Sequence, residues 1–411
     1  MAGMSAHLVR NPSRRAIVTA GGALFASAFA PKFAHAAGGR DPRFVVIILR
    51  GALDGLSAVA PLGDPDYAGL HGSIALAKDG PNPALPLDGF FGLNPSMTTF
   101  ARLFGQKQAA IVHAVTTGYR DRSHFDGQDV LESGQPAPGL TASGWLNRAI
   151  EALPRGERVN GGRSGLGVGA ATPLVLRGAA PVAGWAPTGL ARAGDDVAER
   201  LLDLYRHSDP ALADALAQGL DIEKIVARDM GARQATGGNV VQNMRQIARG
   251  AAKLLAADDG PRIGALAYDG WDTHINEGGA TGRLALLLGG LDGAFEEFEK
   301  ELGPKWKDTT IVAVTEFGRT ARINGTTGTD HGTGTVAFLA GGALNGGRVT
   351  ADWPGLKEQQ LYEKRDLRPT TDLRAVLKGL LADQLGLSAS VLGDKVFPET
   401  ASIAPLKGLV G

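Results

Sequence analysis

The chain alternates between short apolar runs and longer amphipathic stretches. Five runs are apolar at nearly every position, which is typical of strands that helices cover on both faces. These runs are Phe44–Leu49, Ala109–Val115, Ile263–Tyr268, Ile311–Val314 and Val336–Ala340. We interpret the last two as buried parallel strands that open into a site. Apolar residues recur at helical spacing in the stretches between, as in Arg283–Leu302, so the pattern predicts an α/β fold with a doubly wound, mostly parallel sheet flanked by helices.

A long helical region interrupts this alternation. Residues 195–256 are mostly helical by pattern and contain no repeat, so we interpret them as a helical insertion beside the sheet. A closing helix is expected over Thr370–Leu385, where Thr371 and Asp372 supply a cap. We assign residues 37–411 to a single domain.

The first 36 residues have the layout of an export signal. Ser13, Arg14 and Arg15 precede an alanine- and glycine-rich run to Ala30, and Ala34-His35-Ala36 forms a small-x-small cleavage site. The arginine pair and the weak hydrophobicity predict a twin-arginine-type signal peptide over residues 1–36, with the twin-arginine translocase as partner and a periplasmic or secreted product. An uncleaved amphipathic or membrane segment is the alternative. No later segment reaches ~18 apolar residues, so we expect no transmembrane segment in the mature chain.

The amino-acid composition excludes several classes of functional site. Cysteine is absent, which excludes disulfides, thiolate catalysis and zinc–thiolate sites. Basic and acidic residues balance at 42 each, but four basic residues and no acid lie in the first 36 positions. The mature chain is therefore slightly acidic, and we expect no nucleic-acid partner.

Polar residues able to bind a metal follow four of the expected strands. In open α/β sheets, ligands bind beyond the carboxyl ends of the strands, so these residues are expected to converge. Each one alone is more often a turn or capping residue, and their recurrence is the informative signal. They are Asp54, Ser123 with His124, Asp272 with His274, and Glu316 followed by His331.

The segment around Asp272 and His274 has the spacing of a metal site. Residues two apart on an extended segment point the same way, and a carboxylate with an imidazole suits zinc, manganese or iron. The alternative is a turn capped by Asp272, with His274 bound to a backbone carbonyl. His331 lies between Asp330 and Gly332 at the mouth of the sheet, and Asp330 is expected to cap the turn there.

Ser123 is expected at the start of a helix, where backbone N–H groups and the helix dipole attract anions. It is a candidate nucleophile activated by a metal, or a plain N-cap in a capping box with Asp126. Arg120, Arg122 and Arg319 are candidates for binding phosphate or sulfate, and surface ion pairs are the alternative.

Six motifs together resemble an exported bacterial family catalogued as domain of unknown function fifteen-oh-one. They are LRGALDGL (Leu49–Leu56), RSHF (Arg122–Phe125), GWLNR (Gly144–Arg148), WDTH (Trp271–His274), TEFGRT (Thr315–Thr320) and GTDHG (Gly328–Gly332). The resemblance covers essentially all of the mature chain. That family is grouped with the alkaline phosphatase and sulfatase superfamily, whose members place two metal ions around a nucleophile. The resemblance therefore implies an alkaline phosphatase-like three-layer sandwich.

The resemblance also implies roles for individual residues. Asp54 matches the metal-binding Asp of the first strand, and Ser123 matches the nucleophile. Glu316 matches the Asp of an Asp-His pair, but Phe317 stands where that pair has its histidine, so a second metal needs another ligand such as His124. One metal's Asp and two His ligands are matched by Asp272, His274 and His331.

Two functions are consistent with these observations. The first is an exported metal-dependent hydrolase of small phosphate or sulfate esters, in which Ser123 or water attacks and Arg122 or Arg319 neutralises charge. Its cofactor would be a divalent metal ion, with zinc, manganese, calcium and magnesium not distinguished. The second is a superfamily relative without catalysis that serves as an envelope binding or assembly protein. Phe317 favours the second function, and the Asp and His ligand set favours the first.

Overall fold

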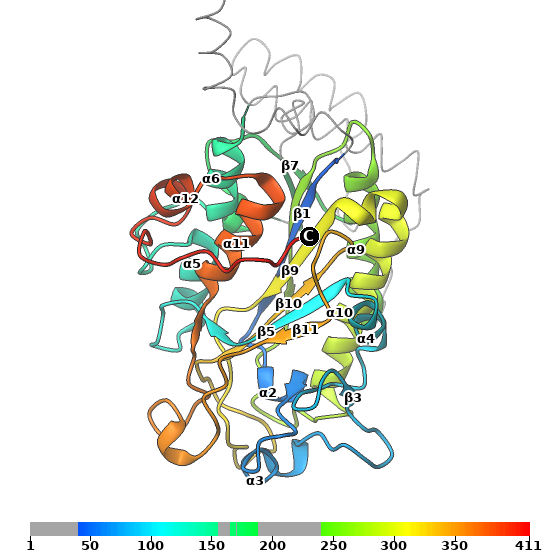
Figure 1. The fold of residues 1–411 in the computed structure, drawn as a ribbon, viewed down its shortest axis with the longest axis vertical. Coiled ribbons are helices and arrows are strands. Elements are labelled where there is room, and N and C mark those ends of the chain that lie inside the picture. The colour runs from blue at the N-terminus through cyan, green and yellow to red at the C-terminus, as the bar shows by residue number, and fades with distance from the viewer. Residues whose placement is uncertain (1–39, 155–164, 170, 188–239) are drawn as a thin grey trace, which may run out of the picture. The chain divides into compact units, whose positions relative to one another are not determined.

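A large β-sheet runs through the middle of the molecule (Figure 1). The computed structural model describes residues 40–154, 165–169, 171–187 and 240–411. In this part of the chain the nine-stranded sheet has the order β11-β5-β10-β9-β1-β8-β6-β7, and β12 pairs with β5. The strands are β1 (Arg43–Arg50), β5 (Ala109–Thr116), β6 (Gly165–Val168), β7 (Val182–Trp185), β8 (Ile263–Asp269), β9 (Thr309–Val314), β10 (Thr335–Ala340), β11 (Arg348–Thr350) and β12 (Thr371–Asp372).

All five predicted strands are present, and the mostly parallel sheet is confirmed. Strand β1 lies between β8 and β9 and is parallel to both, with Val46 beside Ala265 on one side and Val312 on the other. Its residues alternate between two cores: Val45, Ile47 and Leu49 belong to one. A central strand with apolar neighbours on both faces gives the continuous apolar run seen in the sequence.

The expectation that β10 is parallel to β9 is wrong. Strand β10 pairs antiparallel with both β9 and β5. Residues 315–334 join β9 to β10 without a helix, whereas a parallel return needs a crossover to the far end of the sheet. The amino end of β10 therefore lies at the same edge as the carboxyl ends of its neighbours, and this places Glu316 and His331 at that edge.

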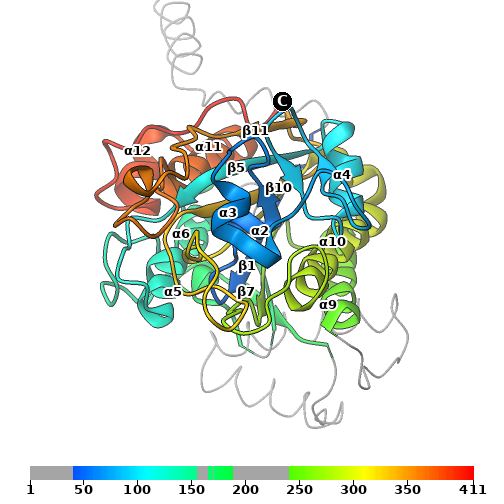
Figure 2. The same cartoon turned by 90° about the horizontal axis from the view of Figure 1, so that it is seen from below.

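Helices cover both faces of the sheet, which confirms the layered α/β architecture (Figures 1 and 2). One core contains Phe100 of α4, Ala251 of α9 and Phe295 of α10, and the other contains Trp145 of α6 and Leu377 of α11. The helices are α2 (Gly55–Ala58), α3 (Tyr67–His71), α4 (Thr98–Gly105), α5 (His124–Ser133), α6 (Trp145–Ala152), α9 (Val240–Ala256), α10 (Arg283–Leu302), α11 (Leu373–Leu385) and α12 (Ala389–Val391).

Smaller elements complete the described structure. A three-stranded sheet has the order β2-β4-β3, and it lies with α2 and α3 in the chain between β1 and α4. Its strands are β2 (Val59–Ala60), β3 (Leu85–Pro86) and β4 (Gly92–Leu93); short 3-10 helices span Gly72–Ile74, Leu174–Leu176, Gly303–Asp308 and Glu358–Gln360, and a π-helical turn spans Leu392–Val396.

The expected helix Arg283–Leu302 is reproduced as α10, and it packs along α9. Glu297 of α10 is buried and accepts hydrogen bonds from Arg245 and Arg249 of α9 at 2.7–2.9 Å, so the pair is joined by charge as well as by apolar contact. Of the predicted helical insertion, the structure describes only α9, and residues 195–239 lie outside the described residues. No helix among the described residues is long and apolar enough to cross a membrane.

Candidate metal centre

Three histidines and one aspartate meet at the edge of the sheet where β1, β8 and β9 end. His331 Nε2 lies 2.9 Å from His124 Nε2 and 3.0 Å from His274 Nε2. The Asp272 carboxylate lies 3.0 Å from His274 Nε2, 3.3 Å from His331 Nε2 and 3.5 Å from His124 Nε2. Four of the six predicted ligands therefore come together, from three separate segments of the chain.

The other ring nitrogen of each histidine is held by an oxygen. His124 Nδ1 lies 2.8 Å from Glu316 Oε1, His274 Nδ1 lies 3.1 Å from Asp330 Oδ1, and His331 Nδ1 lies 2.9 Å from the carbonyl oxygen of Arg122. Carboxylate and carbonyl oxygens accept hydrogen bonds, so each Nδ1 is the donor. In its neutral form, each ring then presents the Nε2 lone pair, which is the tautomer that metal-ligating histidines adopt.

Nitrogen lone pairs 3 Å apart repel one another unless a proton or a metal ion lies between them. Burial lowers the pKa of His331, and the charge of His124 lowers it further, so His331 favours the neutral ring. The hydrogen bond with Glu316 raises the pKa of His124, so this ring favours the charged form when no metal is bound. His124, Asp272 and His331 each offer a ligand atom within 4.8 Å of the others. Imidazole nitrogens and a carboxylate are donors that divalent metals accept, so the arrangement fits a metal ion.

Arg319 orients the aspartate of this group. It is a buried arginine whose Nη1 donates to Asp272 Oδ1 at 2.5 Å and whose Nε donates to Thr329 Oγ1 at 3.1 Å. Burial tends to raise the pKa of Asp272, but the hydrogen bond and charge of Arg319 keep it below its usual value. Asp272 is thereby held as a carboxylate, and Arg319, predicted to bind an anionic substrate, is engaged inside the protein.

Glu316 holds His124 in position through a hydrogen bond to Nδ1, the ring nitrogen that faces away from the other candidate ligands. It is fully buried, and its Oε1 accepts from Gly51 N at 2.9 Å and Gln128 Nε2 at 3.1 Å in addition to His124. The position predicted to ligate a metal thus holds a ligand in place, in the manner of carboxylate–histidine–metal triads. Phe317 stacks on His124 with ring centroids 5.1 Å apart and an interplanar angle of 24°.

Ser123 and Arg122 lie at the start of α5, directly before His124. Ser123 is the N-cap residue, as expected, but its side chain makes no capping hydrogen bond, so the predicted capping box with Asp126 does not form. Its hydroxyl is beside that of Tyr119 instead. Arg122 adopts a left-handed backbone conformation with φ 58°, and its side chain pairs with Asp366 at 2.8 Å.

Arg122 and Arg120 are occupied by internal partners. Arg122 also pairs with Glu363 at 2.6 Å, and Arg120 donates to the carbonyl oxygens of Thr117 and Tyr119. The arginines that the sequence offered for substrate binding therefore have structural roles in the described conformation.

Asp54 lies in a separate, fully buried cluster. Its Oδ2 is 3.0 Å from His71 Nε2, and Ser57 Oγ is 2.9 Å from the same nitrogen. Glu277 contacts Asp54, and burial together with the Asp54 charge raises the pKa of Glu277. Burial tends to raise the pKa of Asp54 as well, but the charge of His71 brings it below its usual value. Asp54 is thus not among the residues that converge on His331.

His71 and Glu277 were missed by the sequence analysis. His71 ends α3 inside a segment rich in glycine and proline, and Glu277 follows the Asp272–His274 segment in a loop. Neither position follows a strand end or a periodic pattern. Thr329 Oγ1 donates to Glu277 Oε2 at 2.6 Å, and Thr329 also contacts Arg319, so this cluster is connected to the metal centre through hydrogen bonds.

Comparison with known proteins agrees with the family resemblance. The family model described as "Protein of unknown function (DUF1501)" matches residues 41–396. The chain belongs to this family. Among curated proteins, none matches the sequence.

Solved structures with a related arrangement are distant in sequence. The crystal structure of Ps i-CgsB aligns with a TM-score of 0.40 at 11% identity, covering 89% of this chain and 75% of the other. The same protein in complex with k-i-k-neocarrahexaose gives 0.39 at 10% identity, covering 89% and 77%. Phosphonate monoester hydrolase of Agrobacterium radiobacter gives 0.36 at 12% identity, covering 84% and 74%. Scores this low support no conclusion about activity.

Proposed function

We propose that this member of the family is a metal-dependent hydrolase of phosphate or sulfate esters. One observation carries the proposal: His331 Nε2 lies within 3.0 Å of the Nε2 atoms of both His124 and His274, and the Asp272 carboxylate lies 3.0–3.5 Å from all three. The Nδ1 atom of each histidine is hydrogen-bonded to an oxygen, which leaves Nε2 for a metal. Three imidazoles with one carboxylate favour zinc or another first-row transition metal over calcium and magnesium.

The chain's own residues supply position and charge. When bound, a divalent metal would polarise an ester oxygen as a Lewis acid. Glu316, Asp330 and the Arg122 carbonyl keep the three imidazoles directed at one point, and Arg319 keeps Asp272 ionised. Ser123 directly precedes His124 at the N-terminus of α5, so its hydroxyl is the candidate nucleophile, and a water molecule is the alternative.

Metal analysis tests the proposal directly. Residues 37–411 purified without chelator should contain close to stoichiometric metal, and His331→Ala and His274→Ala should lose it while remaining folded. Asp79→Asn, which alters an exposed carboxylate away from the centre, is the control and should keep its metal. A metal-free wild type that no added divalent ion stabilises against heat would refute the metal centre.

Turnover decides between hydrolysis and binding alone. An aryl phosphate or aryl sulfate should be hydrolysed by the metal-loaded protein, and the loss of activity in Ser123→Ala would identify serine rather than water as the nucleophile. The internal ion pairs of Arg122 and Arg319 favour the second candidate function, an envelope binding or assembly protein. A metal-loaded protein that binds phosphonates but hydrolyses no ester would support that second function.

We also propose export by the twin-arginine route, which rests on the Arg14-Arg15 pair and the Ala34-His35-Ala36 cleavage site. In cells, the mature form should appear outside the cytoplasm. Arg14→Lys together with Arg15→Lys should leave an uncleaved precursor in the cytoplasm. Unchanged export of that double variant would refute this route.

A further inference from the structure

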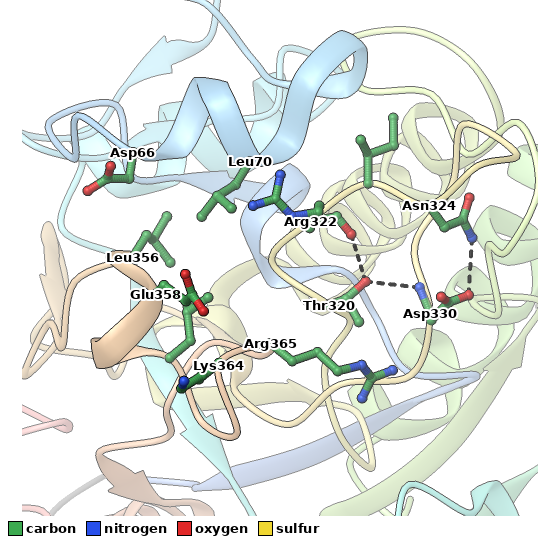
Figure 3. A pocket seen from close by; sticks show the side chains of 12 residues that line it. Asp66, Leu70, Thr320, Arg322, Asn324, Asp330, Leu356, Glu358, Lys364 and Arg365 are labelled. Atoms are coloured by element: carbon green, nitrogen blue, oxygen red, sulfur yellow. Dashed lines mark hydrogen bonds between the residues drawn. The ribbon is translucent and has the colours of Figure 1, made fainter.

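A pocket of about 710 Å³ lies next to the metal centre. The two share Asp330, whose carboxylate holds His274 Nδ1 at 3.1 Å and also lines the pocket. Figure 3 shows Asp330 and Asn324 on one side of the pocket, hydrogen-bonded at 3.1 Å. The volume is in the range of small-molecule sites. A substrate with its ester at the metal centre would therefore have room for its remaining part here.

Apolar and charged side chains both line the pocket. Leu70, Ile323, Leu356 and Leu361 contribute the apolar surface. The charged side chains are three basic and three acidic: Arg322, Lys364, Arg365, Asp66, Glu358 and Asp330.

These charges are not equally available to a ligand. Asp330 is engaged by His274 and Asn324, and Arg365 Nη1 lies 3.3 Å from Asp366 Oδ1. The Arg322 side chain is exposed and makes no hydrogen bond or ion pair with any described residue. In Figure 3, the Arg322 side chain points away from Asp330 toward Leu70, and the Arg365 side chain extends toward Asp330. Arg322 is thus the lining arginine without an internal partner among the described residues.

A strained turn forms one wall of the pocket. Glu363 and Lys364 both have left-handed backbones, with φ 52° and φ 56°, between Tyr362 and Arg365. A two-residue turn of this kind normally uses asparagine and glycine, because other residues are strained in this conformation. Such strain persists where the surroundings impose it, which is common at ligand sites.

Arg122 connects this turn to the metal centre. Its guanidinium pairs with Glu363 at 2.6 Å and Asp366 at 2.8 Å, while its carbonyl oxygen holds His331 Nδ1 at 2.9 Å. One residue therefore fixes both a pocket wall and a metal ligand. The pocket and the centre are built as one site.

We infer that this pocket binds the non-reacting part of the substrate and that this part carries a second anionic group, recognised by Arg322. The inference rests on the proposed function and adds the substrate class: esters of phosphate or sulfate that bear a second negative charge. Guanidinium groups suit this role because they remain charged and bind oxyanions in two-pronged geometry.

Binding of non-hydrolysable phosphonates tests the inference without turnover. Calorimetry would compare n-alkyl phosphonates with ω-carboxyalkyl phosphonates of equal and increasing chain length on the zinc-loaded protein. The carboxylate should raise affinity about 10-fold at one intermediate length and less beyond it. Arg322→Gln should reduce that ratio toward one. Lys78→Gln, an exposed lysine outside the pocket, should keep the ratio.

The outcomes separate this inference from the proposed function. If methylphosphonate binds but the carboxylate adds nothing at any length, or adds as much in Arg322→Gln, the pocket inference is overturned and the metal centre stands. If methylphosphonate does not bind while an ω-carboxyalkyl phosphonate binds in an Arg322-dependent way, the pocket stands and the proposed function falls. Binding of neither compound refutes both.

Discussion

His113 should make folding sensitive to mild acid. It lies in β5 and is fully buried, with Nε2 2.9 Å from the Val59 carbonyl oxygen and Nδ1 accepting from Ala114 N at 2.7 Å. Phe91 stacks on its ring at 5.1 Å. Both nitrogens are thus used by the neutral form, and a second proton would remove the acceptor at Nδ1. Burial lowers the pKa of His113 from 6.5 to about 4.

The sign and the size of the effect follow from linkage. Because the folded pKa lies below the unfolded value, the stability from this residue is fully present above pH 6.5 and is lost as the pH falls toward 4. A pKa difference of one unit between the folded and unfolded states corresponds to about 1.4 kcal/mol. The contribution of His113 to the free energy of unfolding therefore falls by about 3 kcal/mol below pH 4 and by about 2.5 kcal/mol at pH 4.5. A domain is typically stable by only about 5–15 kcal/mol, so the effect is measurable.

This pH-dependent loss of stability can be measured by urea unfolding between pH 7.5 and pH 4.5. The two proteins compared are residues 37–411 with the native sequence and the same residues with His113→Gln. Glutamine can donate to the Val59 carbonyl but does not titrate. The difference in unfolding free energy between the two proteins should shrink by about 2.5 kcal/mol as the pH falls. Loss of metal in acid affects both proteins and cancels in the difference. A difference that stays constant over this range would refute the claim that folding holds His113 neutral.

Two further substitutions test the site and the packing beneath it. Glu316→Gln removes the charged partner of His124 and should weaken metal binding about 10- to 100-fold, measured by competition with a chelating dye; unchanged affinity would contradict the supporting role of Glu316. Gly144→Ala would place a Cβ 2.1 Å from the Leu174 carbonyl oxygen, and we expect a loss of about 3 kcal/mol or failure to fold. Gly105→Ala, with nothing within 4 Å, is the matched control and should unfold near the wild-type temperature.

The fold was predictable wherever the burial of an element gives its sequence a recognisable pattern of apolar residues. Strand β1 is apolar throughout because helices cover both its faces, and α10 shows its helical spacing over its full length. The direction of β10 left no such pattern, since a buried strand has the same composition in either direction. Only the absence of a helix in residues 315–334 pointed to an antiparallel return.

The candidate ligands were predictable because α/β sheets generally bind ligands at the carboxyl ends of their strands. The hydrogen-bond partner of each side chain follows no such rule. Asp272, His274 and His331 could be expected at one edge of the sheet. Whether Arg319 would meet a substrate or a carboxylate of the protein depends on how loops pack, and sequence spacing does not encode that. For the same reason Asp54, at a strand end like the others, could not be predicted to face His71.

Three observations together indicate one metal position rather than two. Phe317, at the position where the resemblance has a histidine, lies against His124 and His331 with centroids 5.1 and 5.5 Å away, so its ring fills the space that another ligand would use. Glu316 already has four donors around its two oxygens. Asp54 faces His71, a partner that supplies positive charge without a metal. Within the described residues the donors left over converge once, on His331. In the proposed hydrolase with one metal position, charge on the rest of the substrate would be met by side chains, and Arg322 of the neighbouring pocket is available for that task.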